Sequence, residues 1–210
     1  MCSSLELVLD HTALIPCRDK PEEEKQAIRK LGDILPSTNT TWYVTREYLK
    51  HTQNTLWGKL KEHHPLPKLQ SSLQRALWEL LKLTQSRHHH CKNLPLTSNG
   101  ETGLKLHVIS RNAYNDLGQR GSELYNVLGE LRGKYGIGGE DVEVVSIALL
   151  ASIKTRSTVT LVTVDRGIIE VVEELKRRLG SLSEVNYLRL ERPNELLARI
   201  NCTKQMLLDA

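Results

Sequence analysis

The stretch that decides the fold is GEDVEVVSIALLASIKTRSTVTLVTVD, residues 139–165. Its first part follows a glycine-rich break and is apolar enough to predict a helix over 140–153. Its second part is rich in β-branched residues and predicts a strand over 158–164 that ends at Asp165. A helix that leads into a strand is the repeating unit of parallel α/β sheets.

The flanking sequence extends this alternation in both directions. We expect further strands at 5–9, 41–44 and 185–190, and helices at 21–35, from 46, and at 67–87, 113–131, 167–179 and 194–200, with a loop at 91–105. This order predicts an α/β fold of three layers, with a central, mostly parallel sheet between helices. The 210 residues suit a single domain over 1–210, with a helical insertion at 55–105.

The composition excludes several classes of protein. With 39% hydrophobic and 26% charged residues, the chain resembles ordinary soluble proteins rather than disordered or fibrous ones. No apolar run approaches the roughly 20 residues of a membrane span, so we expect no membrane association and a cytoplasmic location. The four cysteines are scattered without a C-x-x-C pair, which argues against a zinc ribbon or a disulfide framework.

Charge is distributed unevenly along the chain. Residues 44–92 contain nine Lys/Arg and three acidic residues, whereas Glu140, Asp141 and Glu143 form a compact acidic group. A basic stretch beside an acidic cluster suits a polyanion that approaches a metal site, although a solvated helical face would have the same charges. The three tryptophans, Trp42, Trp57 and Trp78, could stack on bases, and Trp78 also fits the leucine pattern of a core.

Three aspartates are the main candidates for chemistry. Asp10 and Asp165 end predicted strands, and Asp141 begins the helix that precedes the second of these strands. Because functional groups gather at the carboxyl ends of parallel strands, we expect the three to converge, where Mg²⁺ or Mn²⁺ would offset their repulsion. Each could instead serve only as a helix cap or turn residue. Thr12 and Thr163 either orient the aspartates by hydrogen bonds or satisfy strand ends.

These elements resemble the PIN-domain nucleases. The resemblance lies in Leu-Val-Leu-Asp10-His-Thr12, in Glu140-Asp141-Val-Glu143 at the start of an apolar helix, and in Thr163-Val-Asp165 at the end of a strand. It covers residues 5–52 and 110–200, in the family's order. Within the family, the stretch from Leu131 to Glu143 is similar to the small protein-only RNase P enzymes, which mature the 5′ ends of tRNA precursors.

The resemblance implies a metal-dependent endoribonuclease. Asp10, Asp141 and Asp165 would be catalytic and would hold Mg²⁺ or Mn²⁺, together with Glu47. The partner would be structured RNA, such as a tRNA precursor, and the protein would form homo-oligomers. The basic insertion would bind the RNA backbone through Lys59, Lys61, Lys68, Arg75 and Lys82.

The sequence departs from the family pattern at one position. PIN nucleases place a glutamate in the helix after the second strand, and the most natural alignment puts His51 there. Either Glu47 reaches the metal, or His51 substitutes, or the site has one ligand fewer. The last case motivates an alternative, a catalytically inactive PIN-like module that binds RNA or protein. A toxin of a toxin–antitoxin pair is a third reading, which the length of the chain disfavours.

Overall fold

The computed structural model describes residues 4–14, 20–35, 38–45, 47–52, 104–180 and 183–208. Within these residues, five parallel strands form one sheet in the order β3-β2-β1-β4-β5. The strands are β1 (Leu5–Leu9), β2 (Thr40–Val44), β3 (Leu104–Val108), β4 (Val159–Val162) and β5 (Leu188–Glu191). The predicted α/β class is confirmed, and every strand pairing described is parallel.

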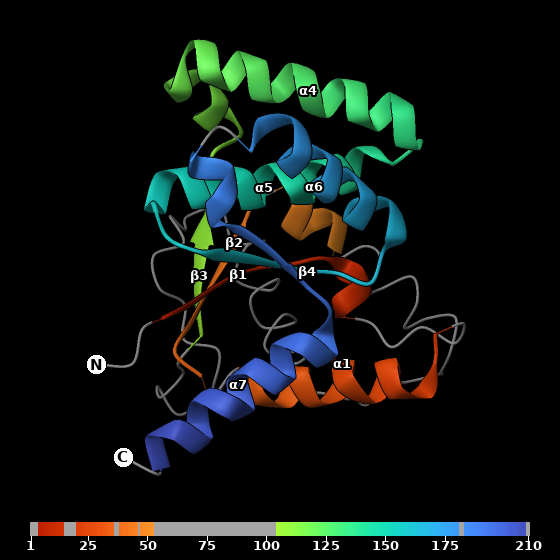
Figure 1. Cartoon of the computed structure of the whole chain (residues 1–210), viewed down its shortest axis with the longest axis vertical. Helices are drawn as coiled ribbons and strands as arrows, with labels where there is room; N and C mark the ends of the chain where they lie inside the picture. Colours follow the sequence, from red (N-terminus) through yellow and green to blue (C-terminus); the bar gives the residue numbers. More distant parts are fainter. Residues whose placement is uncertain are drawn as a thin grey trace.

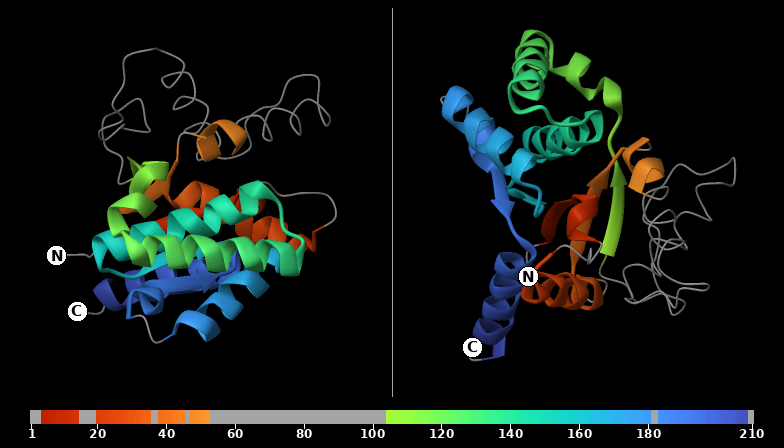
Figure 2. Two further views of the ribbon diagram at one scale, coloured as in Figure 1. Left: turned by 90° about the horizontal axis from the view of Figure 1, so that it is seen from above. Right: turned by 90° about the vertical axis from the view of Figure 1, so that its right-hand side faces the viewer.

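Helices cover both faces of the sheet (Figure 1). Helices α1 (Glu22–Ile34) and α7 (Pro193–Leu208) lie on one face, and α5 (Gly139–Thr155) and α6 (Arg166–Leu179) lie on the other. A further helix, α4 (Gln119–Tyr135), packs against α5 and α6 on the side away from the sheet (Figure 2). Because α5 lies between the sheet and α4, its middle part from Val144 to Ser152 is buried except for one residue, which explains why this part of its sequence is apolar around nearly its whole circumference.

Alternating side chains of the strands divide the core into two clusters. On one face, Leu7, Leu9 and Trp42 pack with residues of α1 and α7. On the other face, Val8 and Leu161 pack with residues of α5 and α6. This division follows from the two-residue period of a strand, which sends neighbouring side chains to opposite faces. Trp42 is fully buried in the first cluster, so it is not available to stack on a base.

Several elements differ from the sequence prediction, among them the C-terminal helix α7, which was expected over 194–200 and extends to Leu208. Strand β3 (Leu104–Val108) was not predicted. Its first two residues are the last two positions of the expected loop and insertion, and its other three residues follow them. The single helix expected over 113–131 is divided into the 3-10 helix η3 (Arg111–Leu117) and α4, because Gly118 between them has a φ of 58°. The expected strand over 185–190 begins only at Leu188, and Ser183–Tyr187 is the 3-10 helix η4.

The topology brings the ends of several elements to one edge of the sheet. Asp10 follows the last residue of β1, and residues 163–165 connect β4 to α6. Helices α5 and α6 both begin at this edge, since each runs antiparallel to the strands it covers (Figure 1). The carboxyl edge of the sheet is therefore where the predicted site residues can meet.

The helical insertion expected at 55–105 lies almost wholly outside the described residues. None of the helices that the structure describes combines the length and apolar character needed to cross a membrane.

Candidate metal centre

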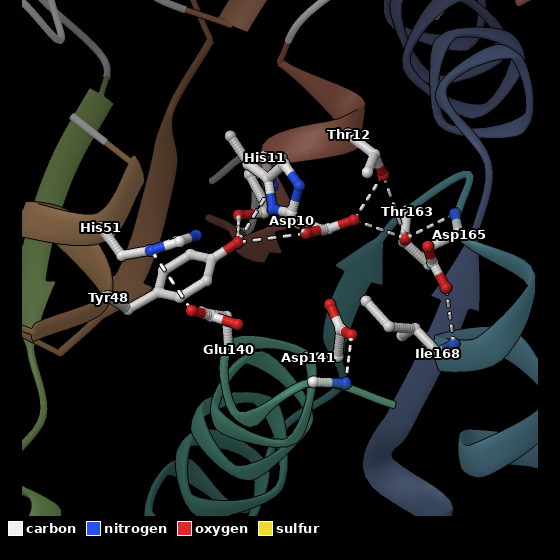
Figure 3. Close-up of polar contacts among 12 residues, drawn as sticks. Asp10, His11, Thr12, Tyr48, His51, Glu140, Asp141, Thr163, Asp165 and Ile168 are labelled. Atoms are coloured by element: carbon white, nitrogen blue, oxygen red, sulfur yellow. Dashed lines mark hydrogen bonds and ion pairs between the residues drawn. The ribbon is translucent and has the colours of Figure 1, made fainter. Parts of the chain in front are cut away.

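Asp10 is the centre of a buried hydrogen-bond network. The residue is 0% exposed, and its Oδ2 accepts hydrogen bonds from the hydroxyls of Thr12 and Thr163, the latter at 2.8 Å. Its Oδ1 accepts a hydrogen bond from the Tyr48 hydroxyl at 3.2 Å and lies 3.0 Å from His11 Nδ1 (Figure 3). Thr12 and Thr163 therefore both donate hydrogen bonds to Asp10, as their expected orienting role would require.

This network keeps the Asp10 carboxyl ionised. Burial alone would raise its pKa, but the His11 imidazole beside it and the hydroxyls of Thr12 and Thr163 lower the pKa below its ordinary value. The neighbouring Tyr48 hydroxyl has a pKa well above its ordinary value, because it is buried and faces the charge of Asp10. The phenol therefore stays protonated and remains a donor to the carboxylate.

Asp165 lies next to Asp10 and caps a helix. Its Oδ1 accepts the backbone N–H of Ile168 at 3.1 Å, in the first turn of α6. Its own backbone N–H donates to Thr163 Oγ1 at 3.0 Å. Thr163 therefore connects the two aspartates, since the same hydroxyl donates to Asp10. The capping role and a role in the site are compatible at this position.

Asp141 approaches from the opposite side. Its Oδ2 accepts the backbone N–H of Gly138 at 2.9 Å, at the start of α5. Burial raises its pKa, the hydrogen bond from Gly138 lowers it, and the negative charges of Asp165 and Asp10 raise it further, so that the net direction is upward. Figure 3 shows the carboxylates of Asp10, Asp141 and Asp165 gathered at the sheet edge. The predicted convergence of the three aspartates is therefore observed.

The donor set of this cluster suits a hard divalent cation. The three carboxylates supply only oxygen, as Mg²⁺ and Mn²⁺ prefer, and the pKa of Asp141 is raised by burial and, to a smaller extent, by the negative charges of Asp165 and Asp10, which a cation would offset. In the part of the chain that the structure describes, no three histidine, cysteine, aspartate or glutamate side chains stand in an arrangement ready to hold a metal ion. Binding of a cation by all three carboxylates would therefore require these side chains to move, with water as further ligands, which Mg²⁺ commonly retains.

The helical segment 47–52 supplies the other wall of the cluster. Glu47 is exposed at its beginning, whereas Tyr48 is buried against Asp10. His51 lies at the rim, with its Nδ1 3.6 Å from Glu140 Oε1 and its ring 6.0 Å from that of His11 in an edge-to-face arrangement (Figure 3). His51, one of the two residues considered for the family's glutamate position, is therefore in contact with this rim.

Sequence reasoning missed several contacts of the cluster. Tyr48 and His11 were not candidates, because a single tyrosine or histidine beside apolar residues carries no pattern that distinguishes such a role. Glu143, a member of the compact acidic group, accepts a hydrogen bond from the Thr45 hydroxyl at the wall of the cluster. The Thr45 hydroxyl also accepts the Tyr48 backbone N–H at 3.0 Å. Thr45 therefore connects Glu143 of α5 to the segment that positions Tyr48.

The predicted RNA-binding residues lie outside the described residues, in the segment 53–103: Lys59, Lys61, Lys68, Arg75 and Lys82. Trp57 and Trp78 lie in the same segment. Their roles stay predictions from the sequence.

Comparison of the chain with protein-family models, with curated proteins and with solved structures found no match.

Proposed function

We propose that the chain is a Mg²⁺- or Mn²⁺-dependent endoribonuclease of PIN-like architecture. The observation that carries the proposal is the gathering of Asp10, Asp141 and Asp165 at the carboxyl edge of a parallel sheet, where burial, and then the charges of Asp165 and Asp10, raise the pKa of Asp141. Carboxylates that repel one another in a partly buried site are typical of cation binding and of catalysis. The order of the three motifs along the chain supports the same function.

Each residue of the cluster has a separate part in this proposal. Asp10, Asp141 and Asp165 would hold the cation, which when bound supplies an activated water and neutralises charge on a phosphodiester. Thr163 orients both Asp10 and Asp165 through its hydroxyl. Helices α5 and α6 begin at this edge, and the partial positive charge of their first turns favours an anionic substrate.

RNA is the proposed substrate on grounds of charge. The basic stretch 44–92 includes the segment 47–52 that forms one wall of the cluster, and its surplus of Lys/Arg suits a phosphate backbone. Recognition of this kind depends on shape and charge more than on sequence, so structured RNA is the substrate class. A precursor tRNA is the first member to test.

The experiment is a cleavage assay with variants that remove charge but keep hydrogen bonds. Asp165→Asn and Asp141→Asn retain an oxygen that can accept the Ile168 and Gly138 N–H groups, so we expect both proteins to fold. Asp10→Asn is less suitable, because its amide N–H₂ would face hydroxyl and imidazole donors. The matched control is Asp33→Asn, an exposed aspartate of α1 on the other face of the sheet.

We expect wild type and Asp33→Asn to cut structured RNA with Mn²⁺ and not with EDTA. Asp165→Asn and Asp141→Asn should lose more than about a hundredfold in rate, beyond the 10- to 100-fold that partners of metal ligands typically contribute. Unchanged cleavage in both variants would refute the proposal.

RNA binding without any cleavage would favour the inactive binding module. The position of His51 at the rim, where the resemblance leads one to expect a glutamate, is the observation behind that alternative. Such binding should be strongly dependent on salt and indifferent to EDTA.

A further inference from the structure

A group of positive side chains lies where α4 packs against α6, outside the aspartate cluster. At its centre is Glu174 of α6, which is only 8% exposed. Its carboxylate accepts hydrogen bonds from Lys134 of α4 at 3.2 Å, and from Arg177 and Arg178 of α6 at 2.8 Å and 3.1 Å. Arg178 also donates to Glu130 of α4 at 2.8 Å. Lys134, Arg177 and Arg178, which we call the basic cluster, are thus three cations that share two carboxylates.

The basic cluster has hydrogen-bond donors for a further partner. A lysine carries three N–H donors and an arginine five, and the two carboxylates engage five of the donors in all. The side chains of Lys134 and Arg177 are 50% and 71% exposed, so a ligand from solvent can reach them. Phosphate oxygens are acceptors that exposed lysine and arginine side chains bind well.

The fold does not need all three cations. Arg178 connects the two helices by itself, because it donates both to Glu174 of α6 and to Glu130 of α4. Arg177 pairs with Glu174 within one helix, and an exposed ion pair of this kind contributes little to stability. The positive charge of Lys134 and Arg177 therefore exceeds what the buried carboxylate requires.

Positive charge continues beside the basic cluster. Lys176 of α6 lies near Arg189 of β5, and burial and then the charge of Arg189 lower the pKa of Lys176. The charge of Glu173 opposes this effect without cancelling it. Cations that repel one another at a half-buried place indicate a positive potential on this side of the protein, which attracts a polyanion.

The basic cluster is close to the candidate metal centre, since the same helices carry both. Asp165 caps the beginning of α6, and a Cβ on Gly167 would lie 2.8 Å from Ile137, in the segment between α4 and α5. Glu174 follows Gly167 after two turns of helix, which is about 10 Å along its axis. Phosphates of one strand follow one another at about 3.4 Å along a duplex axis, so this distance corresponds to about three of them.

We propose that the basic cluster binds the phosphate backbone of structured RNA, a few nucleotides from the bond that faces the three aspartates. The inference rests on the proposed function, since it assigns a second contact to the same substrate. Contacts of this kind fix the register of the substrate on the protein without reading its sequence. The basic cluster would therefore act alongside the segment 44–92, from the opposite side of the candidate metal centre's helices.

The test is the binding of an RNA hairpin by the full-length protein, followed by fluorescence anisotropy in EDTA at several salt concentrations. The α4–α6 variant combines Lys134→Ala with Arg177→Ala. Arg178 stays in place and still pairs with Glu174, so we expect this variant to fold, which urea unfolding checks.

The matched control combines Lys25→Ala with Arg29→Ala on α1. These two cations also share one carboxylate, that of Glu22, but they lie on the other face of the sheet (Figure 1). Both double variants lose the same charge, so a difference between them reports the place of the charge.

We expect the control to bind the hairpin as the wild type does. In the α4–α6 variant the slope of log affinity against log salt should become shallower by about 2, because two phosphate contacts are lost. Its affinity at about 0.1 M salt should fall by about tenfold or more. Arg177→Ala alone should reduce the slope by about 1, and it replaces the double variant if that protein does not fold.

The outcomes separate this inference from the proposed function. Unchanged binding by the α4–α6 variant would overturn the inference and leave metal-dependent cleavage unaffected. Equal losses in both double variants would also overturn it, because total charge rather than its place would then set the affinity. The expected loss of binding in a protein that never cleaves RNA would support the basic cluster and overturn the nuclease. Absence of hairpin binding by the wild type would overturn the inference, and RNA as the substrate with it.

Discussion

Removing one oxygen atom from Tyr48 should destabilise the protein by about 2 kcal/mol. The Tyr48→Phe change keeps the buried ring and leaves no cavity of the size that a truncated side chain would create. It removes the hydroxyl that donates to Asp10 Oδ1 and that accepts the His11 backbone N–H. The effect is therefore one of hydrogen bonding rather than of packing.

The magnitude follows from the groups left behind. Asp10 keeps the hydroxyls of Thr12 and Thr163 and the contact with His11, so its charge is still compensated. The His11 N–H loses its bond to the hydroxyl, and an unsatisfied backbone donor in a buried place costs about 1–3 kcal/mol. We take the middle of this range as the expected loss in the free energy of unfolding.

Urea unfolding at neutral pH, followed by circular dichroism, measures this loss. The m-values of the two proteins should agree, because the same surface is exposed when each unfolds. The control is Tyr125→Phe, since Tyr125 is 67% exposed on α4 and its change should stay within about 0.5 kcal/mol. If Tyr48→Phe were as mild as Tyr125→Phe, the hydrogen-bond network around Asp10 would not have the strength inferred here.

Three further changes test other parts of the structure. Thr163→Val should lower the free energy of unfolding at neutral pH, because the ionised Asp10 loses a donor. Since the pKa of Asp10 is lowered on folding, this stabilisation is present above the unfolded pKa and is lost as the pH falls through the folded pKa. The difference in unfolding free energy between Thr163→Val and wild type, measured in urea, should therefore shrink as the pH falls over that range. A difference that stays constant would contradict the role of Thr163 as a donor to the ionised Asp10. Gly121→Ala should destabilise the protein severely in a thermal melt, because a Cβ there would overlap the backbone carbonyl of Tyr114. Gly129→Ala on the same helix meets no atom within 4 Å and should raise stability by about 0.5–1 kcal/mol, so a loss there would show that α4 has a neighbour on that face.

Local patterns along the chain were sufficient for most of the elements. Helix α5 and strand β4 follow from the apolar run and the β-branched run of residues 139–165, and β1 has the bounds predicted for it. The errors fall where local pattern is weak. Strand β3 begins within a segment that was expected to be a loop, and Val185, which was expected in a strand, is buried in the 3-10 helix η4. Such short segments take their structure from the surface they pack on.

The sequence by itself determined the α/β class and the candidate site of three aspartates. It did so because strands alternating with helices imply a parallel sheet, and residues that end such strands share one edge. Only the tertiary structure decided what surrounds Asp10. Tyr48 lies 38 residues from Asp10 along the chain, and Thr45 lies 98 residues from Glu143. Contacts over such separations leave no periodicity in the sequence, since they arise when β1, β2 and α5 pack together and bring single polar side chains into one buried cluster.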